Sequence, residues 1–110
     1  MSIANATINT TDTIVLTVPA DKSYAITTIL ICNVAVDDGT GTADTNFDMH
    51  VIPSGQTKTD TNLVINNVEV AAEDTFTFNV ERLVLDQGDQ IVFVGKSPTN
   101  LSATISYLEV

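Results

Sequence analysis

The 110-residue chain contains no tryptophan, one cysteine and one histidine, and these shortages exclude several kinds of site. A single cysteine cannot form an intramolecular disulfide. Cys32 lies in an apolar run, so we expect it to be a small buried hydrophobic residue. Zinc sites take several Cys or His ligands, and Cys32 with His50 are too few to form one.

Positive charge is also scarce. Four Lys or Arg residues stand against fourteen Asp or Glu residues, which gives a formal net charge of −10. Such a chain is repelled by a phosphate backbone and would release few counterions on binding it, so we expect no nucleic-acid partner. The chain has no long apolar run and no basic N-terminal region, so we also expect neither a membrane span nor a signal peptide.

No recognisable catalytic set is present. His50 shares a predicted strand face with Asp48, but no Gly-x-Ser-x-Gly turn supplies a nucleophile. Among fourteen carboxylates, close pairs are expected by chance, so they do not indicate a glycosidase. We therefore predict that the protein is not an enzyme and has no cofactor. The alternative is a small hydrolase, which loss of an activity in a His50→Ala variant would favour.

What the chain has in abundance is β-branched residues in short alternating segments. Seventeen threonines accompany many Val and Ile residues, which fit a pleated strand better than a helix. The segments are separated by Asp, Gly, Pro and Thr turns, and no helical period is present. We predict an all-β fold, a two-sheet antiparallel β-sandwich of jelly-roll or Greek-key type with about eight strands. The expected strand segments are residues 3–9, 13–18, 24–36, 47–52, 63–70, 75–80, 83–85, 90–95 and 101–110.

The chain reads as one β-sandwich domain, residues 13–110, preceded by an N-terminal strand or arm, residues 1–12, for which no partner strand is evident. Two polar ten-residue loops, 37–46 and 53–62, are separated by one strand and should lie at opposite ends of the sheet as long crossovers. The connection 71–74 has the length of a hairpin turn, and Gly88 can supply a positive φ in the short connection 86–89.

The longest expected strand, residues 24–36, carries apolar side chains on both faces. Alternation places Tyr24, Ile26 and Leu30 on one face and Ile29 with Ile31 on the other. Apolar residues on a second face either fill another core layer or contact another subunit. We therefore expect a homo-oligomer. The candidate contact residues are Val15, Ile29, Ile31, Leu108 and Val110.

The acidic loop is the one place where the residue types suit a metal ion. Asp37, Asp38, Asp44 and Asp48 lie in and just after a Gly-containing loop, and calcium prefers several carboxylate and carbonyl oxygens. Their spacing matches no EF-hand, so we predict no strong calcium site. Carbohydrate binding, the other common use of a small β-sandwich, usually needs exposed aromatic rings, and all six aromatic residues fit apolar strand faces. A calcium- or carbohydrate-binding module remains an alternative.

Two segments resemble the small virion proteins of tailed bacteriophages. Residues 17–33 contain a strand, a Val-Pro-Ala-x-Lys turn and a long strand that ends in Asn33. Residues 83–91 contain a Leu-x-x-Gly-Asp turn, and a closing strand with Ser106 and Tyr107 follows. The resemblance covers roughly residues 13 to 110, and its motifs are turn residues rather than active-site residues.

The resemblance implies a non-enzymatic structural protein located in a virion. The expected role is a capsid decoration, or cement, subunit that stabilises the phage head, with a small tail or fibre component as the alternative. The partners it implies are the major capsid protein or tail proteins and further copies of the chain, in a trimer by analogy with decoration proteins.

Overall fold

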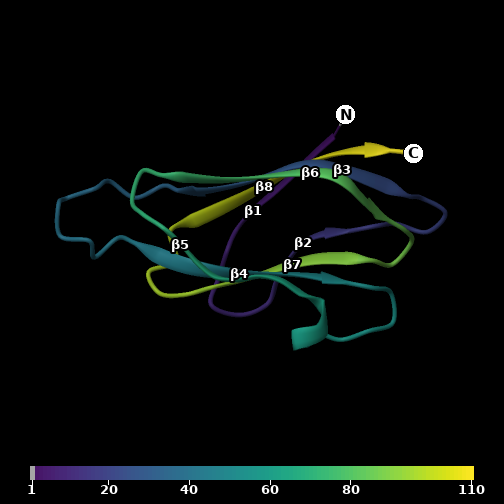
Figure 1. The fold of residues 1–110 in the computed structure, drawn as a ribbon, viewed down its shortest axis with the longest axis horizontal. Coiled ribbons are helices and arrows are strands. Elements are labelled where there is room, and N and C mark those ends of the chain that lie inside the picture. The colour runs from purple at the N-terminus through teal and green to yellow at the C-terminus, as the bar shows by residue number, and fades with distance from the viewer. Residues whose placement is uncertain (1) are drawn as a thin grey trace.

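The computed structural model describes residues 2–110, and within this range the side chains of all residues except 80–82. It contains eight strands and one short 3-10 helix, η1, shown in Figure 1. They are β1 (Ser2–Thr7), β2 (Thr13–Thr17), β3 (Tyr24–Asn33), β4 (Thr45–Ile52), η1 (Asp60–Asn62), β5 (Leu63–Val70), β6 (Thr75–Leu85), β7 (Gln90–Gly95) and β8 (Leu101–Glu109).

The strands form two four-stranded antiparallel sheets. Sheet A has the order β1-β8-β3-β6 and sheet B the order β2-β7-β4-β5, and the two lie one above the other in Figure 1. The predicted all-β two-sheet sandwich is therefore confirmed. This strand order is that of an eight-stranded jelly roll, which decides between the two topologies that the sequence left open.

The connections differ from the prediction. Only β4 and β5 are neighbours both in sequence and in a sheet, so the short connections 71–74 and 86–89 pass between the sheets and neither forms a hairpin. Of the two long loops, the one after β3 crosses to the other sheet, whereas 53–62 joins β4 to β5 within sheet B. The two loops do lie at opposite ends of the molecule (Figure 1).

The N-terminal segment has a partner, contrary to the expectation. β1 pairs with β8 from Ser2 opposite Tyr107 to Thr7 opposite Ser102, so it is an edge strand of sheet A. The two ends of the chain consequently lie side by side (Figure 1).

The alternation of inward and outward side chains along β3 reverses near the middle of the strand. Tyr24 and Ile26 point into the core, and then the register with both β6 and β8 shifts between Ile26 and Thr28. A bulge of this kind adds one residue and reverses the alternation. Ile29 and Ile31, both 0% exposed, therefore face the core. They are not contact-surface residues, and the prediction that they were is wrong.

The same shift places Leu30 and Cys32 on the outer face of sheet A. Leu30 is 37% exposed, although it was predicted to point inward. Cys32 is partly exposed rather than fully buried. Thr27, at the bulge, donates its hydroxyl hydrogen bond to Ser106 of β8, which satisfies a carbonyl there.

The core between the sheets is formed by large side chains from both. Phe47 of β4 is fully buried, with its ring centroid 5.7 Å from that of Phe76 and 6.0 Å from that of Phe93.

Among residues 2–110, no helix has the length and apolarity to cross a membrane.

Asn33 closes the end of β3 and is 1% exposed. Its side-chain amide donates to the carbonyl oxygens of Ala43, at 2.8 Å, and Val70, at 3.0 Å. Its side-chain oxygen accepts from the amide of Ala35 at 3.0 Å, and its backbone amide donates to Asp74. One buried side chain thus joins the end of β3 to the loop before β4 and to the end of β5.

Candidate functional site

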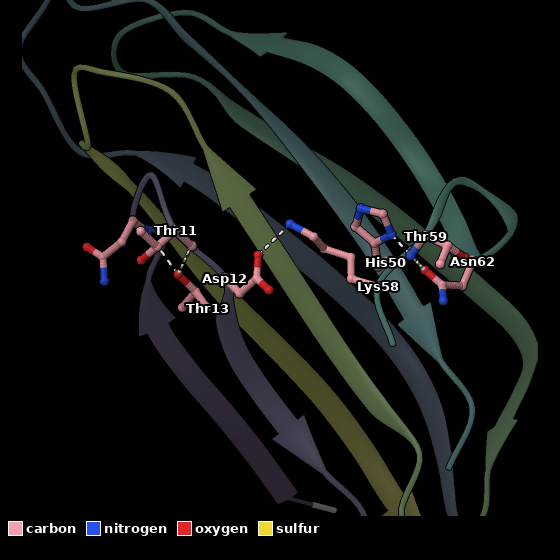
Figure 2. Close-up of polar contacts among 8 residues, drawn as sticks. Thr11, Asp12, Thr13, His50, Lys58, Thr59 and Asn62 are labelled. Atoms are coloured by element: carbon pink, nitrogen blue, oxygen red, sulfur yellow. Dashed lines mark hydrogen bonds and ion pairs between the residues drawn. The ribbon is translucent and has the colours of Figure 1, made fainter. Parts of the chain in front are cut away.

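Two regions of the molecule are candidates for function: the surroundings of His50 with the acidic loop, and the surfaces able to contact a partner. His50 projects from the outer face of β4 but is only 6% exposed, because the loop 53–62 folds over it. Figure 2 shows the imidazole directed at Asn62, with Nδ1 2.8 Å from the side-chain oxygen Oδ1.

The hydrogen bonds of Asn62 fix the role of each ring nitrogen. Its Oδ1 accepts from the backbone amide of Thr59, and its Nδ2 donates to the carbonyl of Thr57 at 2.9 Å. Since Oδ1 is an acceptor, Nδ1 of His50 is the donor, and in the neutral ring Nε2 carries the free lone pair. This network holds the loop against sheet B.

The loop also reaches across the sheet to the connection between β1 and β2. Lys58 forms an ion pair with Asp12, which Figure 2 shows beside the β1–β2 turn. A groove of about 390 Å³ lies beside this loop. It is lined by Asp48, His50, Lys58, Thr59, Asp60, Leu63 and Asn66.

Two residues that line this groove, Asp48 and His50, are the pair that the sequence placed on one strand face. The carboxylate of Asp48 accepts a 2.6 Å hydrogen bond from the backbone amide of Asn67. Asn67 has a positive φ of 56°, which is irregular for a strand residue. The hydrogen bond from its amide to Asp48 therefore stabilises an irregular part of β5. His50 is bonded to Asn62 and Asp48 to the amide of Asn67, so each side chain supports a segment next to β4. Among the described residues that line the groove, none is aromatic.

The four aspartates considered as calcium ligands each accept hydrogen bonds from a different residue. Asp37 accepts from the amide of Gly39, and Asp44 accepts from the amide of Ala72. Asp38 accepts from the hydroxyl and amide of Thr40, and these hydrogen bonds lower the pKa of its carboxyl. Within residues 2–110, described as above, no group of three or more His, Cys, Asp or Glu side chains is placed to hold a metal ion.

We therefore expect calcium to leave the stability unchanged. A site occupied at 100 times its Kd would add about 2.7 kcal/mol to the free energy of unfolding and raise the melting temperature by several degrees. Thermal melts in millimolar calcium and in chelator should coincide. A rise of several degrees with calcium would contradict this expectation.

The outer face of sheet A is a second candidate surface. Alternation and register place Thr, Ser, Asn and apolar residues on it, and its described side chains include no Asp, Glu, Lys or Arg. We call this set the outer face of sheet A: Ile3, Asn5, Thr7, Ala25, Thr28, Leu30, Cys32, Thr75, Thr77, Asn79, Val84, Ser102, Thr104, Ser106 and Leu108.

Its apolar members are well exposed. Ile3 is 65%, Val84 54%, Leu108 38% and Leu30 37% exposed, and hydroxyl-bearing residues surround them. The acidic residues lie mainly in the connections and on sheet B, at positions such as Asp12, Asp86 and Glu69.

The predicted contact residues are only partly on this face. Leu108 belongs to it, and Val110, 70% exposed, follows β8. Val15 lies at an irregularity of β2 and packs partly against the core. Leu30 and Val84 also lie on this face but were not among the predicted contact residues. Leu30 was expected to point inward because the bulge in β3 was not foreseen, and Val84 was assigned to a separate short strand.

No family model matches the chain, and no curated protein or solved structure matches it either. The functional argument therefore rests on the fold and on these surfaces.

Proposed function

We propose that the protein is a structural subunit of a virion, a capsid decoration protein that binds the assembled phage head through the outer face of sheet A. The virion assignment comes from the turn motifs of residues 17–33 and 83–91. The observation that supports a binding role is that the described side chains on the outer face of sheet A carry no charge, on a chain whose net charge is −10.

A flat sheet face suits repeated docking on a surface lattice. Exposed Leu30 and Val84 supply apolar contact area, and the Thr and Ser hydroxyls can donate or accept hydrogen bonds. With strands about 4.8 Å apart and a rise of about 3.3 Å per residue, the face measures roughly 20 by 26 Å. A footprint of this size can be repeated over a particle surface, and the simultaneous docking of many copies would add avidity.

The same reasoning applies to a tail or fibre location, which is the alternative. A carbohydrate-binding module has less support, because the described residues that line the groove beside His50 include no aromatic ring. The expected partners are the major capsid protein or a tail protein, and the expected location is the virion.

Binding to particles that lack the protein tests the proposal. The wild-type chain should sediment with heads, or with tails for the alternative, prepared from virions grown without this gene. Leu30→Glu should weaken that binding at least about tenfold, because it places a carboxylate in an apolar contact, a loss of about 1.4 kcal/mol or more.

Val64→Glu is the matched control, since Val64 is 49% exposed on β5 of sheet B. It adds the same charge away from the outer face of sheet A and should bind like the wild type. Circular dichroism would check that both variants fold. A wild-type chain that binds neither heads nor tails would reject the proposal.

A further inference from the structure

The four edge strands of the sandwich differ in how well they are protected against pairing with another chain. β2 has a register shift between Ile14 and Leu16, and β5 is irregular opposite residues 47–50. β6 is shifted opposite Ile26 and Thr28. Bulges of this kind twist an edge away from pairing, as do charged residues and proline.

β1 has none of these protections. It pairs with β8 over six residues without a register shift, and its sequence, Ser-Ile-Ala-Asn-Ala-Thr, contains no charge and no proline. Ile3, Asn5 and Thr7 are all exposed. A straight, uncharged edge strand is a ready template for another strand.

The direction of the free backbone groups follows from the hydrogen bond just after β1. The amide of Ile8 donates to the carbonyl of Leu101 at 2.9 Å, which continues the β1–β8 pairing. Backbone groups of alternate residues point to opposite sides of a strand, so those of Ala4 and Ala6 face β8, and those of Ile3, Asn5 and Thr7 face the open edge.

Asn9 is the next residue whose backbone groups would point to the open edge, but these groups form hydrogen bonds within the same chain. Its carbonyl accepts from the amide of Gly95 at 2.7 Å, and its amide donates to the hydroxyl of Thr13. The open edge is therefore confined to the stretch from Ile3 to Thr7.

We propose that two copies of the chain associate through β1 in an antiparallel pair centred on Asn5. In this register Asn5 lies opposite Asn5 of the second copy, and Ile3 lies opposite Thr7 of the second copy. Each opposing pair exchanges both of its backbone hydrogen bonds, because all three residues direct these groups to the open edge. The opposing residues all belong to the outer face of sheet A. The outer-face side chains of both copies therefore lie on the same side of the joined sheet.

A second copy is the occupant that the edge fits, because the proposed pairing joins two identical, straight and uncharged strands about a twofold axis. At a net charge of −10 each, two copies repel one another over most of their surfaces, and the β1 edge with the adjoining outer face of sheet A allows approach without opposing carboxylates. The twofold pairing is closed, so it gives a dimer rather than the trimer implied by the resemblance. It also joins two outer faces into one surface of twice the area. The inference does not depend on the proposed function.

Asn5→Pro and Asn5→Asp test the pairing. Proline at this position removes an amide that points away from β8, so the fold should be retained while the central hydrogen bond between copies is lost. Aspartate sets two carboxylates directly opposite each other in the dimer, and like charges in that position are destabilising.

Thr77→Asp is the matched control. Asn5, Thr104, Leu30 and Thr77 form one row across sheet A, so Thr77 lies on the same face and in the same row, at the opposite edge. Light scattering after size exclusion at micromolar concentration should give a dimer for the wild type and Thr77→Asp. Both Asn5 variants should be monomeric, or dimerise at least about tenfold more weakly. A wild-type monomer or trimer, or a dimer that both Asn5 variants leave unchanged, would overturn the proposal.

Discussion

Replacing Asn33 with aspartate should lower the free energy of unfolding by about 3–5 kcal/mol at pH 7, the usual cost of an uncompensated buried charge. The substitution preserves shape but exchanges a donor of two hydrogen bonds for an oxygen that faces the carbonyls of Ala43 and Val70. With the side chain 1% exposed, water cannot replace those bonds. Chemical denaturation followed by circular dichroism measures the loss.

The loss should depend on pH in a defined direction. Burial and the two facing carbonyls favour the neutral acid, so they would raise the pKa of an aspartate at position 33 in the folded state above its unfolded value. The folded variant then binds more protons than the unfolded one, and its stability falls as pH rises from the unfolded pKa, about 3.9, towards the folded pKa. The difference from wild type should be smallest at acidic pH.

Asn79→Asp is the control, because Asn79 is exposed on β6. This change should alter stability by no more than about 0.5 kcal/mol, as surface substitutions usually do. If Asn33→Asp matched this control at pH 7, Asn33 would not be the hydrogen-bonding centre described above.

Ile31→Ala should reduce the free energy of unfolding by about 2–5 kcal/mol, the range found when a large aliphatic side chain is removed from a core. Ile31 is 0% exposed in β3, the strand that lies between β6 and β8. The neighbouring Leu30 points to the opposite side and is 37% exposed. Leu30→Ala should therefore cost roughly half as much or less.

Urea denaturation of the two variants measures the difference directly. The comparison examines the reversal of faces at the β3 bulge, since uninterrupted alternation from Tyr24 would bury Leu30 and expose Ile31. A larger loss for Leu30→Ala than for Ile31→Ala would contradict the orientation of this strand.

The sequence predicted the architecture because local alternation and turn residues determine where strands begin and end. The bounds of β5 (Leu63–Val70) and β7 (Gln90–Gly95) agree with the predicted segments 63–70 and 90–95, since clear turns flank both. The two-sheet sandwich followed from the number and length of such segments.

What could not be predicted depends on contacts between distant segments. The only sign of the β3 bulge in the sequence is Thr28, which interrupts the apolar alternation. A single polar residue on one face of a strand does not indicate that a bulge adds a residue there. The length of the connection 71–74 allows a hairpin, but whether the next strand stays in the same sheet is decided by packing. The predicted segments 75–80 and 83–85 are one strand, β6, and the charged residues 81–82 lie within it.

The role of His50 was also beyond sequence reasoning. Its partner Asn62 lies in a polar loop with no motif, and only the folding of residues 53–62 over β4 brings the two together. Likewise, the outer face of sheet A becomes visible only when four strands from distant parts of the chain are aligned.

The strand order also bears on how the chain reaches this fold. Apart from β4 and β5, every neighbouring pair joins strands that are separated along the chain, and such topologies fold slowly, in about milliseconds to seconds, because long loops must close before contacts form. Among the eight strands β1 is synthesised before the others, whereas its partner β8 is synthesised after them. The strand with the least protected edge therefore cannot pair with β8 until the other six strands have been made.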